Sequence, residues 1–487
     1  MSLGKKTVES VIWNYVSFAS GKFLTFISTI ILARLLAPEQ FGVVAIALLA
    51  IQYLDSIGDL GISEALIYQR ENLTQARNVA FIISVVAGCG LAVVAYLLAP
   101  LVAGFYDEPT VMPMLQVLAL TLAINGFGQT QLALLTKELR FRQKILPDLS
   151  RSLVKGVSSI ALAALGMGAW SLVWGQVLGS LAITVVLWAI STWRPRLVWD
   201  AALARTMLGY GVQVVLIQML SVLWATADYL IVGRLLGRAD LALYQQAFRL
   251  SDLLIINIAF VVGRVLFPSY TKMNHDMDRL RAGFLTTIRY IALVTLPFSI
   301  GISAVAPDFV GLVFGAQWLG MIPALQLLAL RAGVSTLSFN SGQLLKAIGR
   351  PEIVNYQTLA KLCVLVMVVL LTVPYGFVAV AAGQLGVSLF VLCIDYLTMR
   401  QMIGVSLGAI WQRIMPALIP AVAMGLTTWL IVAAIPAQWR LIGLAVAVVT
   451  GMIVYVGGLW LTDRALWLSA LGWLNKVSGA RFQRDSS

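Results

Sequence analysis

Basic side chains occur inside segments of this chain that are otherwise apolar enough to cross a membrane. Those that do not fall in loops are Lys22, Arg151, Lys155, Arg249, Arg264, Arg289, Arg331 and Lys361. A cation centred in lipid costs about 2.5–3.5 kcal/mol on insertion scales. These side chains are therefore expected to face protein or water, where a cation can bind an anionic group such as a phosphate.

Two segments gather polar residues around such cations. With about 100° of rotation per helical residue, one face of segment 10–33 carries Asn14, Ser17, Gly21, Lys22, Thr25, Ser28 and Thr29. One side of segment 242–268 carries Gln245, Gln246, Arg249, Asp252 and Asn257. The spacing of Arg249 and Asp252 also permits an ion pair within one helix.

The depth of each cation separates two interpretations. Arg264 and Arg289 lie near predicted helix ends, where a long side chain can reach the interface. The deeper Lys22, Lys155, Arg331 and Lys361 have no acid three or four residues away, so each either binds substrate or pairs with a distant acid. We predict that the substrate-binding residues are Lys22, Lys155, Arg249, Arg331, Lys361, Asn14 and Gln245.

Acidic residues are fewer in the same segments. Asp55, Asp59, Asp228 and Asp252 are candidates for coupling Na⁺ or H⁺, and the alternative is that they are interfacial or ion-paired. The excess of cations predicts a cavity that favours an anionic substrate. No cofactor other than such an ion and no metal site is expected, because Cys89, Cys363 and Cys393 lie in apolar segments without Cys/His ligand spacing.

The elements that position these residues are predicted to be membrane helices. The chain has 487 residues, of which 60% are hydrophobic and 11% charged, with a mean hydropathy of +0.91, whereas soluble domains are about 25% charged. The apolar stretches lack the alternation of a membrane barrel. Hydropathy predicts an all-α polytopic protein with fourteen spans, near 10–33, 41–63, 78–103, 113–135, 145–166, 170–192, 208–232, 242–268, 285–306, 323–344, 354–373, 376–399, 414–435 and 441–461.

The distribution of basic residues predicts the orientation. With the N-terminus in the cytoplasm, the external segments hold only Arg34, Arg234, Arg238 and Arg440, and most other basic residues outside the spans are cytoplasmic. This asymmetry accounts for most of the net charge of +13 and argues against nucleic acid as a partner. The first segment lacks a convincing cleavage site and is expected to be retained. The C-terminal segment 464–487 is expected to be a cytoplasmic amphipathic tail that contacts membrane lipids.

The chain resembles itself at an offset of about 200 residues. ARLLAPEQFGVVAIA (33–47) matches GRLLGRADLALYQQA (233–247), and GAWSLVWGQVLGSL (168–181) matches GFVAVAAGQLGVSL (376–389). This repeat predicts two parallel six-helix lobes, 1–205 and 206–405, followed by two helices in 406–463. Transporters with such halves bind substrate near the middle of the membrane between the lobes.

The stretch ARLLAPEQFGVVAIA, followed by DLGISEALI (59–67), is similar to the early signature of bacterial polysaccharide exporters. The chain resembles the polysaccharide transporter family, Wzx type and colanic-acid-exporter-like, within the superfamily of multidrug, oligosaccharidyl-lipid and polysaccharide flippases. The resemblance implies a flippase that moves undecaprenyl-diphosphate-linked oligosaccharide across the bacterial inner membrane by alternating access. Polysaccharide polymerases and glycosyltransferases are the further partners that it implies.

Two other functions fit the sequence less well. Cation-coupled efflux of small molecules would favour an acidic cavity, contrary to the predicted charge balance. A membrane-embedded glycosyltransferase or polymerase would be expected to carry catalytic acids in large loops, whereas the one DxD-like string is DMD (276–278), next to His275. We therefore expect a transporter that is not an enzyme.

Overall fold

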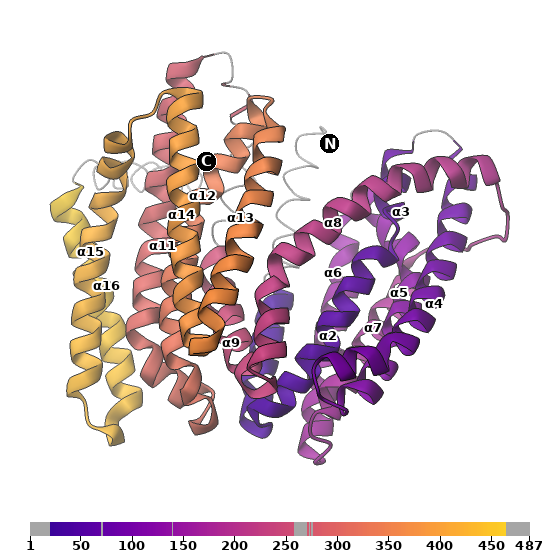
Figure 1. The fold of residues 1–487 in the computed structure, drawn as a ribbon, viewed down its shortest axis with the longest axis horizontal. Coiled ribbons are helices and arrows are strands. Elements are labelled where there is room, and N and C mark those ends of the chain that lie inside the picture. Colours follow the sequence, from indigo (N-terminus) through magenta and orange to yellow (C-terminus); the bar gives the residue numbers. More distant parts are fainter. Residues whose placement is uncertain are drawn as a thin grey trace, which may run out of the picture. The chain divides into compact units, whose positions relative to one another are not determined.

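A computed structural model describes residues 20–69, 72–138, 140–257, 270–271, 273 and 276–463. In this part of the chain the regular structure is helical (Figure 1), and eleven helices are long and apolar enough to cross a membrane. The predicted all-α polytopic fold is confirmed. The predicted spans 10–33 and 242–268 run into residues outside the description, and the predicted span 145–166 is the more polar helix α6 (Phe141–Ala164).

The chain forms two compact units, Met1–Leu243 (unit 1) and Tyr244–Ser487 (unit 2). The lobe boundaries proposed from the repeat stay a prediction. The described helices of unit 1 are residues 20–35, α2 (Pro38–Gly58), α3 (Ile62–Tyr68), α4 (Leu73–Phe105), α5 (Val111–Lys137), α6, α7 (Trp170–Ile190) and α8 (Ala201–Leu235).

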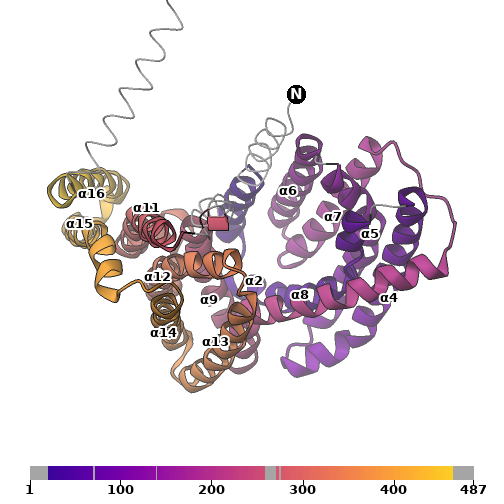
Figure 2. The same ribbon diagram turned by 90° about the horizontal axis from the view of Figure 1, so that it is seen from above.

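Unit 1 is built around α5. This helix packs against α4, α7 and α2, and α6 lies beside α7 (Figure 2). The long helix α8 contacts α2, α3 and α4. Its N-terminus is capped by Asp200, whose carboxylate accepts hydrogen bonds from the backbone N–H groups of Ala202 and Leu203.

The predicted span 41–63 is interrupted inside unit 1. Helix α2 ends at Gly58, and Leu60 and Gly61 then adopt left-handed backbone angles, with φ of 46° and 64°. Here the chain meets α8 so closely that a side chain at Gly211 would overlap the carbonyl oxygen of Leu60. The break therefore lies at a backbone-to-backbone contact that glycine permits.

The sequence motif at the start of α2 forms a tight turn. Pro38 occupies the first helical turn, where the missing N–H costs nothing, and the side chain of Gln40 accepts a hydrogen bond from the backbone N–H of Ala37. A side chain at Gly42 would overlap the backbone carbonyl oxygen of Arg238. The first turn thus contacts the turn that the repeat predicts to be its equivalent.

Unit 2 is built around α11. Its elements are η1 (Asp252–Ile256), α11 (Met277–Val313), η2 (Ala316–Met321), α12 (Ile322–Ala347), α13 (Pro351–Thr372), η3 (Val373–Tyr375), α14 (Phe377–Ile403), α15 (Leu407–Ala434), η4 (Ala437–Trp439) and α16 (Arg440–Thr462), and α9 (Arg238–Ser251) runs into it from unit 1. Helix α11 packs against α12 and α15, and α14 packs against α12 and α13. Figure 2 shows α15 and α16 side by side next to α11.

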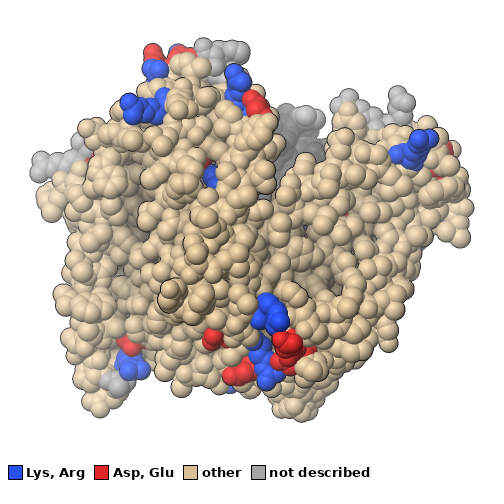
Figure 3. Space-filling view, viewed as in Figure 1, with Lys and Arg blue, Asp and Glu red and all other residues tan. Residues whose placement is uncertain are grey.

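Charged side chains lie mainly at the two ends of each unit. In Figure 3 the middle of each unit is almost free of them on the face shown. Arg234 pairs with Asp107, Arg238 pairs with Glu108 at 2.8 Å, and Arg440 pairs with Asp308 at 3.5 Å. In each pair both partners belong to segments that the predicted topology places outside.

Candidate functional site

Two candidates of the cationic set are exposed on their own units. Lys22 lies on the helix of residues 20–35, and Arg249 lies near the end of α9. The hydroxyls of Thr25 and Ser28 on the predicted polar face donate to the carbonyls of Gly21 and Leu24 in the same helix, which satisfies them in an apolar environment. Asn14 lies outside the described residues.

Lys155 lies between α6 and α7. Its Nζ donates to Oε1 of Gln176 at 2.6 Å. The approach of the helices depends on Gly175, because a side chain there would overlap Oγ of Ser159. The lysine is thus partly buried against a neutral polar side chain.

Arg331 is buried in α12. Its guanidinium pairs with the carboxylate of Asp252 at the start of the π-helical turn η1, and its Cζ lies 4.1 Å from the centre of the Phe248 ring. Its Nε has no hydrogen-bond partner among the described residues. The guanidinium therefore keeps one donor unused.

Lys361 of α13 pairs with a carboxylate that the sequence analysis missed. Its Nζ lies 2.8 Å from Oδ1 of Asp395 on α14, and the side chains are 16% and 4% exposed. Burial to this degree makes each charge depend on the other. The pairing of Arg331 and Lys361 with distant acids, which the sequence left open, is thus observed.

The remaining candidates lie within their units as follows. Gln245 is buried in α9. Asp228 is buried in α8, and its carboxylate accepts a hydrogen bond from the N–H of Tyr229 at 2.9 Å. Whether any of these residues binds substrate or couples an ion stays a prediction.

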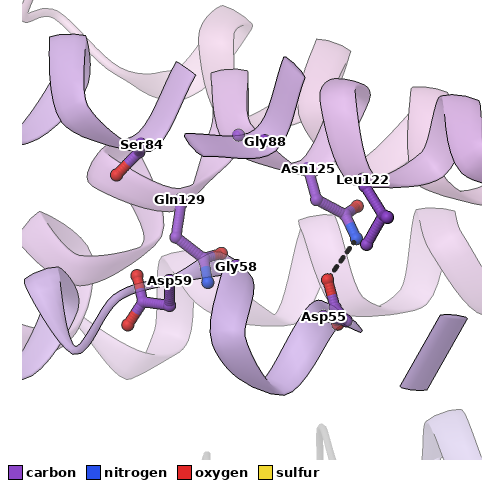
Figure 4. Close-up of a pocket in the computed structure, with 9 residues that line it drawn as sticks. Asp55, Gly58, Asp59, Ser84, Gly88, Leu122, Asn125 and Gln129 are labelled. Atoms are coloured by element: carbon purple, nitrogen blue, oxygen red, sulfur yellow. Dashed lines mark hydrogen bonds between the residues drawn. The ribbon is translucent and has the colours of Figure 1, made fainter. Parts of the chain in front are cut away.

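Asp55 and Asp59 line a small cavity in unit 1 (Figure 4). The nine lining residues come from α2 and its C-cap Asp59, from α4 and from α5. They are Asp55, Gly58, Asp59, Ser84, Gly88, Leu122, Asn125, Gly126 and Gln129. Asp55 is exposed, and its Oδ1 accepts a hydrogen bond from the Asn125 amide at 3.4 Å. Asp59 is buried and accepts hydrogen bonds from the N–H and Oγ of Ser63 at 3.2 and 2.8 Å.

The sequence analysis did not identify Ser84, Asn125 or Gln129 as part of a site. Asn125 and Gln129 are four residues apart, so they lie on one face of α5, and this spacing was the available signal. Ser84 carried no signal of its own, because serine is common in membrane helices.

The DMD string is part of a helix start. The carboxylate of Asp276 accepts hydrogen bonds from the N–H groups of Asp278 and Arg279 at the first turn of α11, which is the arrangement of an N-cap. His275 lies outside the described residues. Among the described residues, no group of three or more His, Cys, Asp or Glu side chains is placed to hold a metal ion.

Comparison with curated proteins finds relatives in bacterial polysaccharide synthesis. The chain is 26% identical over 355 residues to the lipopolysaccharide biosynthesis protein WzxC of Escherichia coli, covering 72% of this chain and 72% of the relative. It is 25% identical over 430 residues to the teichuronic acid biosynthesis protein TuaB of Bacillus subtilis, covering 87% and 89%. The succinoglycan biosynthesis transport protein ExoT of Rhizobium meliloti is 26% identical over 357 residues, covering 73% and 72%.

Solved structures share the fold. A lipid II flippase, MurJ, in an inward closed conformation matches with a TM-score of 0.75 at 14% identity, covering 94% of this chain and 99% of that one. An inward-facing multidrug resistance transporter of the MATE family matches with a TM-score of 0.63 at 16% identity, covering 80% and 98%. The model of one family, described as polysaccharide biosynthesis protein, matches residues 31–323. Since this match spans more than half of the chain, the protein belongs to that polysaccharide biosynthesis family.

Proposed function

We propose that this protein is a flippase that moves undecaprenyl-diphosphate-linked oligosaccharide from the cytoplasmic to the periplasmic leaflet of the bacterial inner membrane by alternating access. Its product would supply surface polysaccharide synthesis, with glycosyltransferases before it and a polysaccharide polymerase after it. Both termini are cytoplasmic in this proposal. The observation that carries it is family membership over residues 31–323, together with relatives named as polysaccharide transport and biosynthesis proteins.

The placement of the cations supports an anionic substrate. Lys22 and Arg249 are exposed on their units, so a diphosphate can reach them. Arg331 is held by a single carboxylate and keeps its Nε unpaired within the described structure. The guanidinium of such an arginine can donate two hydrogen bonds to a phosphate, in a bidentate arrangement, when Asp252 moves away.

The proposal is tested with the full chain in liposomes, by following transfer of a lipid-diphosphate oligosaccharide between leaflets. Lys22→Ala and Arg249→Ala are expected to slow transfer at least about tenfold, since each removes a charge-assisted contact of roughly 1.5–3 kcal/mol. Both side chains are exposed, so the folded yield should not fall. Arg413→Ala is the matched control, because it removes an exposed cation from α15.

The outcomes separate function from site. No transfer by the wild-type protein, with the substrate lipid and both leaflets verified, would overturn the flippase. Transfer at the wild-type rate by both variants would leave the flippase standing and remove Lys22 and Arg249 from the site. Longer glycan chains without leaflet transfer would identify a polymerase instead.

A further inference from the structure

The cavity of Figure 4 lies within unit 1 and contains none of the basic residues proposed for phosphate binding. The space open to the centre of a water molecule is about 10 Å³, which is room for roughly one water or one small ion. Its polar lining consists of oxygen-bearing side chains: two carboxylates, two amides and one hydroxyl, from Asp55, Asp59, Asn125, Gln129 and Ser84. Oxygen ligands are those that hard cations prefer.

Ser84 gives a second, independent observation. Ser84 is 2% exposed, and its Oγ has no hydrogen-bond partner among the described residues. Serine hydroxyls in membrane helices usually donate to a carbonyl of the same helix, as Thr25 and Ser28 do here. Ser84 instead leaves its Oγ at the cavity wall, pointing from α4 toward the side where Asp59 and Gln129 lie (Figure 4).

The backbone at the cavity is interrupted. Helix α2 ends at Gly58, which lines the cavity, and the chain then passes through the left-handed residues Leu60 and Gly61. The C-terminal end of a helix carries a partial negative charge. Interrupted helix ends of this kind coordinate Na⁺ or H⁺ in membrane transporters, where irregular backbone is tolerated only beside a cavity.

The charge around the cavity favours one positive ion. None of its nine lining residues is basic. The carboxylate of Asp59 accepts two hydrogen bonds from Ser63, whereas an ionised carboxylate has about four acceptor positions.

We propose that this cavity binds one Na⁺ ion, with Asp59 and Ser84 as inner ligands and Asp55, Asn125 and Gln129 at its entrance. The carboxylate of Asp59 supplies the charge, and the unpaired Oγ of Ser84 supplies a neutral oxygen. Two carboxylates are the only His, Cys, Asp or Glu side chains among the nine lining residues, which suits a monovalent ion better than a divalent one. This site is separate from the phosphate-binding cations, and its occupancy can be measured without transport.

The test is the thermal unfolding of the purified full chain in detergent, in NaCl and in choline chloride at equal ionic strength. A ligand that binds only the folded state raises the melting temperature with concentration. Wild-type protein is expected to show a saturable rise in NaCl, and binding of radioactive Na⁺ is expected to saturate near one ion per chain. Asp59→Asn is expected to abolish both.

Ser84→Ala distinguishes a ligand from a structural residue. Removing an unpaired buried hydroxyl should leave the unliganded protein as stable as the wild type or more so, so misfolding is not expected. If Ser84 is a ligand, its loss should weaken the affinity for Na⁺ at least about tenfold. This is the lower end of what supporting partners contribute in metal sites. Glu39→Gln is the matched control for Asp59→Asn, because it removes an exposed carboxylate from α2, the helix that Asp59 ends.

Three results would overturn the proposal. Equal melting temperatures in NaCl and choline chloride, without bound radioactive Na⁺, would show that no Na⁺ binds. Unchanged Na⁺ affinity in Asp59→Asn and Ser84→Ala would place any bound ion elsewhere. A response that depends on pH and not on Na⁺ would make the carboxylates proton carriers. Each result is read from binding, so it leaves the proposed flippase activity untouched.

Discussion

Lys361 and Asp395 depend on one another because both are buried between α13 and α14. Removing one partner leaves an uncompensated charge, which destabilises proteins by about 3–5 kcal/mol. Lys361→Met and Asp395→Leu are each expected to lower the free energy of unfolding by that amount. The double variant is expected to recover most of the loss, since an apolar pair of similar volume often replaces a buried ion pair at no cost.

The measurement is unfolding of the three variants and the wild type in detergent, read as a double-mutant cycle. A double variant as unstable as the sum of the single variants would contradict the pair. The single variants also bear on substrate binding. If Lys361 binds phosphate, the double variant should be stable and slow in leaflet transfer.

At the residue scale, the sequence predicted that the buried cations would be shielded from lipid but did not predict their partners. The cost of a cation in lipid indicated that Arg331 and Lys361 would be shielded. Their partners were not predictable, because Asp252 and Asp395 lie 79 and 34 residues away, and a single sequence does not tell which helices touch. Ser84 was missed for the same reason, since an unpaired hydroxyl is a property of the packed structure.

At the scale of elements, Gly42 is the point where two turns meet. A side chain there would overlap the carbonyl oxygen of Arg238, and a backbone atom cannot rotate away as a side chain does. Gly42→Ala is therefore expected to lower the free energy of unfolding by about 3 kcal/mol or more, the upper range for overpacking. Thermal unfolding in detergent measures the effect.

Gly104→Ala is the matched control for Gly42→Ala. Gly104 is an exposed glycine in α4 with open space around its Cα, and alanine is the better helix former by roughly 1 kcal/mol. Its substitution should leave stability unchanged or raise it. Equal melting temperatures for the Gly42 and Gly104 variants would contradict the close contact of the turns.

The helices were largely predictable, and their irregularities were not. The thickness of a bilayer sets the length of an apolar segment, and eleven of the predicted spans coincide with apolar helices in the described residues. The break after α2 escaped prediction because DLGISEALI is apolar enough to continue a helix. The left-handed angles of Leu60 and Gly61 are set by the contact with Gly211 on α8, which the local sequence does not contain.

At the scale of the whole molecule, contacts within each unit are consistent with the predicted topology. On the predicted outer side, Arg234 pairs with Asp107 and Arg238 pairs with Glu108. On the predicted cytoplasmic side, Nζ of Lys137 donates to the carbonyl of Leu66 at 2.8 Å. Each contact joins segments that the distribution of basic residues placed on the same side. Because helices alternate in direction, an error of one span would have separated such partners.

The topology can be measured with single cysteines and a membrane-impermeant maleimide. Cys89, Cys363 and Cys393 are exposed, so they must first be replaced by serine. Asp107→Cys and Arg440→Cys are expected to label in intact cells, and Asp278→Cys and Arg350→Cys only after permeabilisation. The native side chains at these positions are 75%, 50%, 89% and 63% exposed, so burial would not explain a lack of labelling.

The four positions also test the number of spans. Five predicted spans separate Asp107 from Asp278, and five separate Asp278 from Arg440, so each step must change side. Labelling of Asp278→Cys but not Asp107→Cys in intact cells would invert the orientation. If Asp107→Cys and Asp278→Cys both label in intact cells, the number of spans between them is even, so one of the five predicted spans is wrong. The segments 145–166 and 242–268 would then be the first candidates to lose their assignment as spans. Only the predicted pattern agrees with cytoplasmic termini and with the parallel halves that the internal repeat predicts.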